Sequence, residues 1–208
     1  WDLARGLDVA EMALGNSSLY DAIINCAGVA GVSRSFEEPG SYWHENTYAA
    51  ALLFSHARRQ RSVPVVHASS ALAAYPEHSP YAASKYAAEL AALFENAQGG
   101  DIRIVRIHNV YGPGQPDTFV IPRFLRLAAA GQPMPLENGG RALKDYIYVG
   151  DVAEALLASL DGPGGLFHAA SGVWHTPREI GVLAARMTGQ KPRFEEVDAP
   201  WRLADPCP

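Results

Sequence analysis

Three consecutive stretches decide the fold: "VPVVHASS" (63–70), "SPYAASKYAAELAALFENAQGG" (79–100) and "DIRIVRIHNVYGPG" (101–114). The first and third are short apolar runs rich in β-branched residues, which is typical of buried strands. The second has helical spacing. We expect Ser79 to cap this helix, Pro80 to occupy its first position and two glycines to end it. The order strand–helix–strand predicts an α/β fold with a parallel sheet.

The alternation continues on both sides of this unit. "YDAIINCAG" (20–28) predicts a buried strand that opens into a tight loop. In open parallel sheets, ligands bind outside the carboxyl ends of the strands, where this chain places small and polar residues. Further helices are predicted within 39–60 and within 118–135, the second ending at a glycine. Another is predicted within 142–165, where it follows a short strand and has Asp151 as its cap. The last begins at Thr176, with Pro177 in its first turn.

Composition excludes several classes of protein. The 208 residues are 48% hydrophobic, enough for a substantial core, and the formal net charge is -5, which disfavours a nucleic-acid groove. The longest apolar runs fall well short of the ~20 residues of a membrane span. Two cysteines, Cys26 and Cys207, favour a reducing, cytoplasmic setting over a disulfide scaffold. The seven histidines show no metal-ligand spacing, so we expect no metal site.

Tyr81 and Lys85 are four residues apart, so they share one face of the predicted helix. A cation beside a phenol favours the phenolate and lowers its pKa from about 10. Such a pair can act as a base toward a hydroxyl or as an acid toward a carbonyl. The strand that ends in Ser69-Ser70 could add a serine hydroxyl. Taken alone, such a pair is more often two ordinary residues on a surface helix.

The segments around this pair extend the pattern over nearly the whole chain. They resemble the extended short-chain dehydrogenase/reductase family and, within it, the sugar-nucleotide epimerases of the UDP-galactose 4-epimerase type. The resemblance rests on "AGVAGVSRSFEEPGSYWHENT" (27–47), "VVHASSALAAY" (65–75), "SPYAASKYAAE" (79–89), "VRIHNVYGPGQ" (105–115), "GGRALKDYIYVGDVAEAL" (139–156) and "WRLADP" (201–206).

The resemblance implies a Rossmann-like doubly wound parallel sheet with a small C-terminal substrate lobe. Residues 1–115 would form part of the dinucleotide-binding domain with the catalytic helix. Residues 116–208 would form a mixed region that includes the substrate lobe and is interleaved with the sheet. The expected cofactor is NAD or NADP, and the expected substrate is a nucleotide-sugar. The helices at 39–60 and 81–98 resemble those through which family members form homodimers.

The resemblance also implies roles for individual residues. Tyr81 would be the acid/base, Lys85 would hold the nicotinamide ribose and lower the tyrosine pKa, and Ser70 would bind the reacting sugar oxygen. The implied cofactor-binding residues are Asp2, Leu3, Ala27, Gly28, Asn46, Ser69, Tyr81 and Lys85; the implied substrate-binding residues are Ser70, Asn109, Lys144 and Arg202.

Most of these roles have a structural alternative. Ser70 could cap a strand end, Asn46 could be a satisfied buried amide, and Asn109 could be a turn residue. Lys144 could be a surface charge paired with Asp145. Asp2 and Arg202 lie near the ends of the chain.

Three departures from the family pattern bear on function. The glycine-rich loop that follows the first strand would precede Trp1, so we expect the chain to be part of a longer family member. Ala71 and Leu72 stand where sugar-nucleotide 4,6-dehydratases have Asp-Glu, which disfavours dehydration. Lys144 replaces the usual arginine and loses its bidentate fork.

The sequence therefore favours an NAD(P)-dependent sugar-nucleotide 4-epimerase in which Tyr81 moves the proton and hydride transfer is reversible. An NAD(P)H-dependent ketoreductase would use the same residues in one direction. A catalytically silent relative that binds a nucleotide or a protein is the third possibility. We expect neither nucleic acid nor membrane as a partner.

Overall fold

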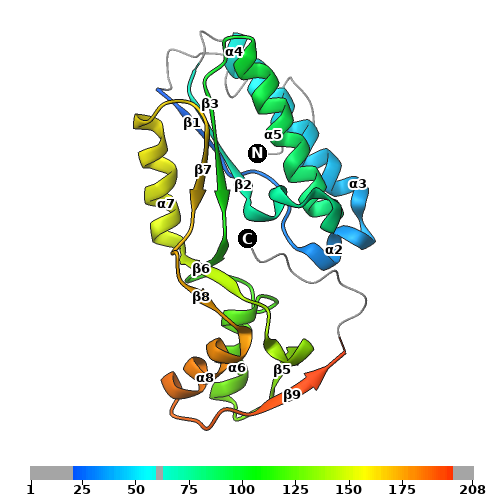
Figure 1. Cartoon of the computed structure of the whole chain (residues 1–208), viewed down its shortest axis with the longest axis vertical. Helices are drawn as coiled ribbons and strands as arrows, with labels where there is room; N and C mark the ends of the chain where they lie inside the picture. Colours follow the sequence, from blue (N-terminus) through cyan, green and yellow to red (C-terminus); the bar gives the residue numbers. More distant parts are fainter. Residues whose placement is uncertain (1–20, 60–62, 199–208) are drawn as a thin grey trace. The chain divides into compact units, whose positions relative to one another are not determined.

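The computed structural model describes residues 21–59 and 63–198, which form two compact units (Figure 1). The first unit comprises the described residues up to Ile107 together with Val152–Ala169. The second comprises His108–Asp151 and the described residues from Ala170 onward. Asp2, Leu3 and Arg202 lie outside the described residues.

The first unit is built on a four-stranded parallel sheet in the order β1-β2-β3-β7. The helices α4 and α5 cover one face of this sheet and α7 covers the other (Figure 1). This arrangement confirms the predicted α/β fold with parallel strands. The strands are β1 (Ile23–Asn25), β2 (Val65–Ser70), β3 (Ile102–Ile107) and β7 (Leu166–Ala169).

The helix α5 (Pro80–Ala97) begins and ends as the sequence predicts. The Ser79 hydroxyl accepts a hydrogen bond from the Ala82 amide at 3.1 Å, and Pro80 occupies the first turn. Beyond the helix, Gly99 takes a positive φ of 88°, and the Asn96 side chain exchanges two hydrogen bonds with the backbone of Ile102 at the start of β3. Two 3-10 turns, Ala71–Ala74 and Pro76–His78, connect β2 to α5.

The helical stretch predicted within 39–60 is not one regular helix. It comprises α3 (Pro39–Tyr42), a π-helical segment (Trp43–Tyr48) and α4 (Ala49–Arg59), preceded by a short helix, α2 (Val32–Glu37). The π segment adds a residue to the turn, and such insertions occur frequently at functional sites. Its buried residue is Asn46.

The core of the first unit lies between the sheet and the helices α4 and α5. Small alanines on both helices allow them to approach the strands closely, and Phe54 fills the space between them. Burial of this apolar surface is the main force that holds the layers together. The buried members are Ala50, Phe54, Ala57, Val65, Ala88, Ala92, Ile102 and Ile104.

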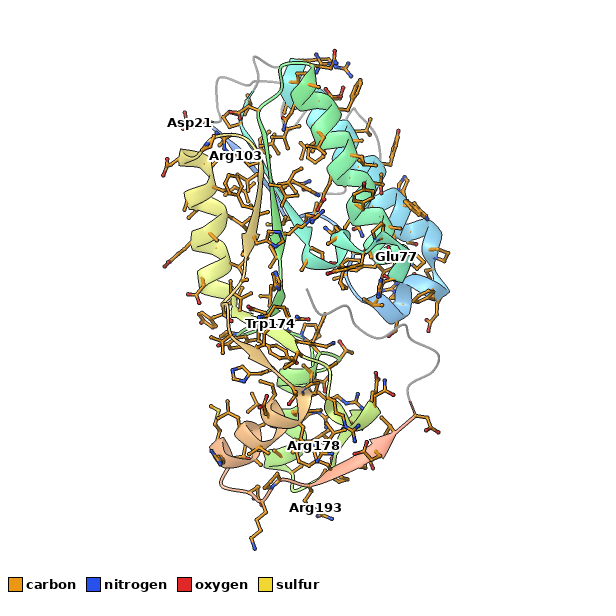
Figure 2. The ribbon with its side chains drawn as sticks, in the orientation of Figure 1. Asp21, Glu77, Arg103, Trp174, Arg178 and Arg193 are labelled. Atoms are coloured by element: carbon orange, nitrogen blue, oxygen red, sulfur yellow. The ribbon has the colours of Figure 1, made fainter. Side chains whose placement is uncertain are left out.

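The buried Arg103 side chain, labelled in Figure 2, ties β3 to the loop before β7. It forms an ion pair with Asp101 at 2.6 Å and donates to the Gly162 carbonyl at 3.0 Å. Its side chain is only 9% exposed, so these partners satisfy a charge that water scarcely reaches.

The described part of the second unit contains two small sheets and two α-helices. Its strands are β4 (Asn109–Tyr111), β6 (Lys144–Tyr148) and β8 (Trp174–His175) in one sheet, and β5 (Met134–Glu137) and β9 (Phe194–Val197) in the other. The helices α6 (Val120–Ala129) and α8 (Pro177–Met187) pack on β5 through a core of Phe124, Ala128, Met134, Leu136, Ala184 and Ala185.

The helix starts in this region test two predictions. Thr176 caps α8 in a full capping box with Glu179, and Pro177 occupies the first turn, as predicted. The predicted Asp151 cap of α7 (Val149–Ala158) is wrong, because β6 runs into this helix without a loop and the helix starts at Val149. Asp151 instead lies in the first turn, where a carboxylate still interacts favourably with the helix dipole.

Within the residues that the structure describes, no helix has both the length and the apolar character needed to cross a membrane.

Candidate active site

The carboxyl end of β2 and the first two turns of α5 bring together Ser70, Tyr81 and Lys85. The Ser70 hydroxyl forms a hydrogen bond with the Tyr81 side chain and also accepts one from the Leu72 amide at 3.2 Å. One helical turn further along α5, the Lys85 ammonium donates to the Ala68 carbonyl at 3.0 Å. The three side chains predicted to be catalytic therefore meet at one end of the sheet.

Lys85 is a buried cation. It is 8% exposed, and loss of water around the ammonium lowers its pKa to about 8, although the charges of Cys26 and Glu89 act in the opposite direction. At neutral pH most of the protein therefore carries a charged Lys85. A pKa this close to neutrality is typical of groups that take part in chemistry.

Tyr81 differs from the sequence-based expectation. Its pKa is raised, chiefly by burial; the hydrogen bond to Ser70 lowers it and the nearby Tyr42 raises it. The predicted lowering of this pKa by Lys85 is therefore not found. The Lys85 ammonium is instead hydrogen-bonded to the Ala68 carbonyl on β2, and burial dominates the pKa of the phenol.

Asn46 clamps the loop that follows β1. Its side-chain oxygen accepts from the Val29 amide at 2.8 Å, and its nitrogen donates to the Val29 carbonyl at 3.1 Å and to the Ser84 hydroxyl at 3.0 Å. Ser84 in turn donates to the Tyr81 carbonyl at 2.8 Å. The π-helical segment thus joins the loop after β1 to the helix that carries Tyr81 and Lys85.

Gly28, in this loop, leaves no room for a side chain. Its φ is +146°, and a Cβ would lie 2.6 Å from the Asn46 Oδ1 and 3.5 Å from the Lys85 Nζ. The loop therefore presents bare backbone beside the lysine, as close approach of a ligand requires. Ala27 precedes it, with its amide bonded to the Asn25 side chain at 3.1 Å.

Tyr42 supports the same loop from α3. Its hydroxyl lies 2.9 Å from the Ala30 carbonyl and 2.8 Å from the Gly31 carbonyl, within donating distance of both. Its ring meets the Tyr81 ring edge-on with centroids 6.1 Å apart. Tyr42 thus contacts both the loop after β1 and the Tyr81 ring.

His67 lies beneath the site on β2 and is fully buried. Burial and, to a smaller extent, the charge of Lys85 lower its pKa to about 3, so the imidazole is neutral at pH 7. Its Nδ1 lies 3.2 Å from the Asn25 Nδ2, and its ring packs edge-on against Phe54. A neutral ring places no competing charge beside Lys85.

The remaining predicted residues have the following places. The Ser69 hydroxyl donates to Glu89 at 2.6 Å. In the second unit, Asn109 is exposed at the start of β4 and donates to the Asp145 carbonyl at 3.0 Å. Lys144 begins β6. The Asp145 carboxylate accepts hydrogen bonds from Ser171 and Gly172, which fixes the loop between β7 and β8.

Four further residues that shape the site are absent from the sequence-based list: Tyr42, Ser84, Glu89 and Arg106. Ser84 and Glu89 could have been predicted from the sequence, because they lie three and eight residues after Tyr81 and therefore near it on the same helix. The contribution of Arg106 depends on the pairing of β2 with β3, which places it beside Ser69.

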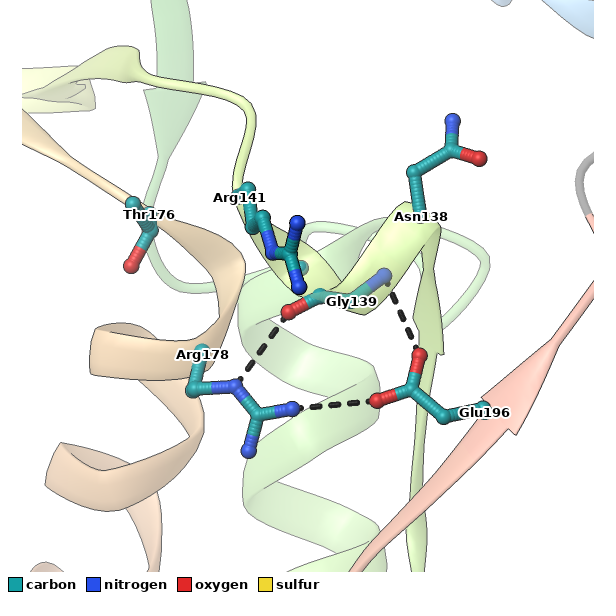
Figure 3. Close-up of a pocket in the computed structure, with 7 residues that line it drawn as sticks. Asn138, Gly139, Arg141, Thr176, Arg178 and Glu196 are labelled. Atoms are coloured by element: carbon teal, nitrogen blue, oxygen red, sulfur yellow. Dashed lines mark hydrogen bonds and ion pairs between the residues drawn. The ribbon is translucent and has the colours of Figure 1, made fainter.

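A pocket of 770 Å³ lies within the second unit, and the described residues that line it include none of the predicted site residues (Figure 3). Arg178 pairs with Glu196 at 3.0 Å and donates to the Gly139 carbonyl at 3.2 Å, while Glu196 accepts from the Gly139 amide. Arg178, Glu196 and the Gly139 backbone therefore satisfy one another, and they connect α8 and β9 to the turn after β5.

Comparison with known proteins identifies relatives of two activities. A dTDP-glucose 4,6-dehydratase from Streptomyces antibioticus is 29% identical over 83% of this chain and 57% of its own length. A UDP-glucuronate 4-epimerase from Thermodesulfobacterium geofontis is 32% identical over 67% of this chain and 47% of its own. The chain thus spans about half the length of these curated relatives.

Solved structures give the same picture. The Thermus thermophilus UDP-glucose 4-epimerase in complex with NAD matches with a TM-score of 0.85 and 28% identity, over 99% of this chain and 72% of that one. A dTDP-glucose 4,6-dehydratase from Streptomyces venezuelae also reaches a TM-score of 0.85, at 25% identity. The profile of the NAD dependent epimerase/dehydratase family matches residues 8–168, and the chain belongs to this family.

Proposed function

We propose that the protein containing this chain is an NAD-dependent sugar-nucleotide 4-epimerase. The observation that carries the proposal is the hydrogen bond between Ser70 and Tyr81 beside the buried Lys85. This set offers a hydroxyl that can give and take a proton, a second hydroxyl that can hold the same substrate oxygen, and a fixed cation.

Proton transfer would occur at the Tyr81 hydroxyl. Tyr81 would take the proton of a sugar hydroxyl that Ser70 holds, and would return it at the end of the cycle. Because the pKa of Tyr81 is raised here, the base form requires additional positive charge near the phenol. A bound oxidised nicotinamide would supply positive charge and a hydride acceptor at this site.

The residues present fit the nicotinamide end of a dinucleotide. Gly28 would admit it, since a Cβ would fill this space, and Lys85 would hydrogen-bond its ribose. Asn46 would act indirectly, because its amide group is bonded to Val29 and Ser84.

The turn after Ser70 favours epimerisation over dehydration. Loss of water from a sugar needs an additional acid and base to move protons at neighbouring carbons. The 3-10 turn that follows Ser70 provides Ala71 and Leu72 at the two positions where dehydratases have acidic residues. A carboxylate that does lie near, Glu89, is engaged by Arg106 and Ser69.

The test is product analysis with the full-length protein. Incubation with UDP-glucose and NAD, followed by NMR of the sugar, is expected to give the 4-epimer with no net change in NADH. A 4-keto-6-deoxy product would instead identify a dehydratase, and NADH consumption with a keto sugar would identify a reductase. Absence of dinucleotide binding would favour a silent relative.

We further propose that the protein is a homodimer formed through α4 and α5. The outward face of α5 exposes Tyr86, Leu90, Leu93 and Phe94, the last at 62%, and these lie on one helical face. A second copy can cover such a patch with its own, which gives a closed two-fold interface.

Replacement of Leu93 and Phe94 by glutamate is expected to convert the dimer to a monomer in analytical ultracentrifugation, because two copies would bring like charges together. The matched control is Leu183→Glu and Met187→Glu on the exposed face of α8, which should leave the dimer intact. A wild-type monomer at micromolar concentration would contradict the proposal.

A further inference from the structure

The carboxyl end of β2 is held by a second polar cluster on its α5 side. Glu89 is 2% exposed, and its carboxylate accepts from the Ser69 hydroxyl at 2.6 Å and from Arg106 at 3.0 and 2.7 Å. The Arg106 contact is bidentate, the geometry that gives a carboxylate–guanidinium pair its directional strength. Ser69 and Arg106 are directly paired in the register of β2 and β3, so Glu89 bridges two strands from the helix above them.

The position of this cluster links it to the proton-transfer groups. Ser69 lies between Ala68, whose carbonyl holds Lys85, and Ser70, whose hydroxyl bonds Tyr81. A shift of Ser69 would therefore displace both neighbouring contacts. Glu89 also lies one helical turn after Lys85, on the same face of α5.

We propose that Glu89 is a positioning residue of the Tyr81–Lys85 site, which fixes the end of β2 through Ser69 and Arg106 and adds a negative charge one helical turn from Lys85. This inference rests on the proposed function of that site. Glu89 would then contribute to catalysis and not only to the stability of α5.

The groups that face Lys85 support the electrostatic part. Cys26 approaches it from the loop after β1, and its thiol pKa is raised by burial. His67 on β2 is neutral, and the pKa of Tyr81 on α5 is raised, so neither offers a negative charge at neutral pH. Against the effect of burial, Cys26 and then Glu89 raise the pKa of Lys85, and Glu89 is the one of the two that is a carboxylate fixed on α5.

The test compares two carboxylates of the same helix in the full-length protein. Glu89→Gln is expected to move the alkaline limb of both kcat/KM and dinucleotide affinity downward by about 1 pH unit, because Lys85 then loses its proton more readily. The control, Glu95→Gln, removes another buried carboxylate of α5 that pairs with arginine, here Arg58. It should cost similar stability and leave both pH profiles unchanged. Dinucleotide affinity, measured by calorimetry, depends on the protonation state of Lys85 and does not require turnover.

A second variant keeps the test valid should Glu89→Gln fail to fold, since that change leaves Arg106 buried without its partner. The double replacement Glu89→Met with Arg106→Met removes both charges together, which is far less damaging to a buried pair than removing one. It should fold and still lower kcat/KM, because the end of β2 loses its anchor, and it should shift the alkaline limb less than Glu89→Gln does, because the positive charge of Arg106 is removed as well.

Profiles that superimpose on wild type for both Glu89 variants would overturn the inference and leave the proposed function standing. Failure of the proposed function has a different signature, since wild type itself would then neither bind dinucleotide nor turn over a nucleotide-sugar.

Discussion

Replacement of Tyr81 by phenylalanine in the full-length protein is expected to lower kcat by about 10²–10⁴-fold, the contribution typical of a positioned acid/base. The variant keeps the aromatic ring, and with it the edge-on contact to Tyr42, so the fold should be retained. It loses the hydroxyl that Ser70 bonds and that would carry the proton. Steady-state kinetics with a nucleotide-sugar would measure the loss, and dinucleotide affinity should change little.

The control for this variant is Tyr86→Phe. Tyr86 lies five residues further along α5 and is exposed, so its hydroxyl is remote from Ser70. This variant should retain wild-type turnover. A Tyr81→Phe enzyme with kcat within a factor of three of wild type would rule out Tyr81 as the acid/base.

Replacement of Lys85 by methionine is expected to abolish most turnover and, at neutral pH, to stabilise the protein. Methionine has nearly the same length and fills the same buried space without a charge. The cost of burying the ammonium is what lowers the Lys85 pKa from 10.5 to about 8. Its removal should raise the unfolding free energy by roughly 1–3 kcal/mol, part of the value being offset by the lost hydrogen bond to Ala68.

The pH dependence of this gain follows from proton binding. Below pH 8 the lysine is charged in both states, and the wild-type protein bears the full cost of its burial. Between pH 8 and 10.5 the unfolded chain holds more protons than the folded one, so wild-type stability rises with pH relative to the variant. The stability difference should therefore be largest at pH 7 and shrink toward pH 10.5.

Thermal unfolding at several pH values would measure this difference. The control is Lys191→Met, in which the replaced lysine is exposed and should show no pH-dependent gain. A Lys85→Met variant that is less stable than wild type at pH 7 would show that the ammonium contributes more through its contacts than it costs by burial.

Features that depend on local sequence could be predicted. The caps at Ser79 and Thr176 need only a few neighbouring residues, and the spacing of Tyr81 and Lys85 follows from one helical turn. The parallel sheet followed from the alternation of apolar runs and helices. The cluster of Ser70, Tyr81 and Lys85 followed from the resemblance to a family.

Features that depend on tertiary contacts could not be predicted from the sequence. The residue types of the π-helical segment at 43–48 are also common in regular α-helices, so the sequence does not distinguish the two. The hydrogen bonds of Asn46 to Val29 and Ser84 are tertiary contacts that accompany the π-helical geometry. The pKa of Tyr81 depends on where the Lys85 ammonium points, which spacing alone does not give. The parallel pairing of β5 with β9 joins segments about sixty residues apart and left no local pattern.

The contacts of β2 with α5 have a geometric consequence for the Tyr-x-x-x-Lys spacing. Because α5 runs back antiparallel to β2, a step toward the start of the strand matches a step toward the end of the helix. Two residues of strand cover about 6.6 Å and four residues of helix cover about 6.0 Å, so the two periods nearly coincide. The pairs Ser70–Tyr81 and Ala68–Lys85 are such coincident points. The spacing of residues along β2 thus matches the spacing of Tyr81 and Lys85 along α5. If three or five residues separated the two on the helix, only one of them could keep its contact with β2.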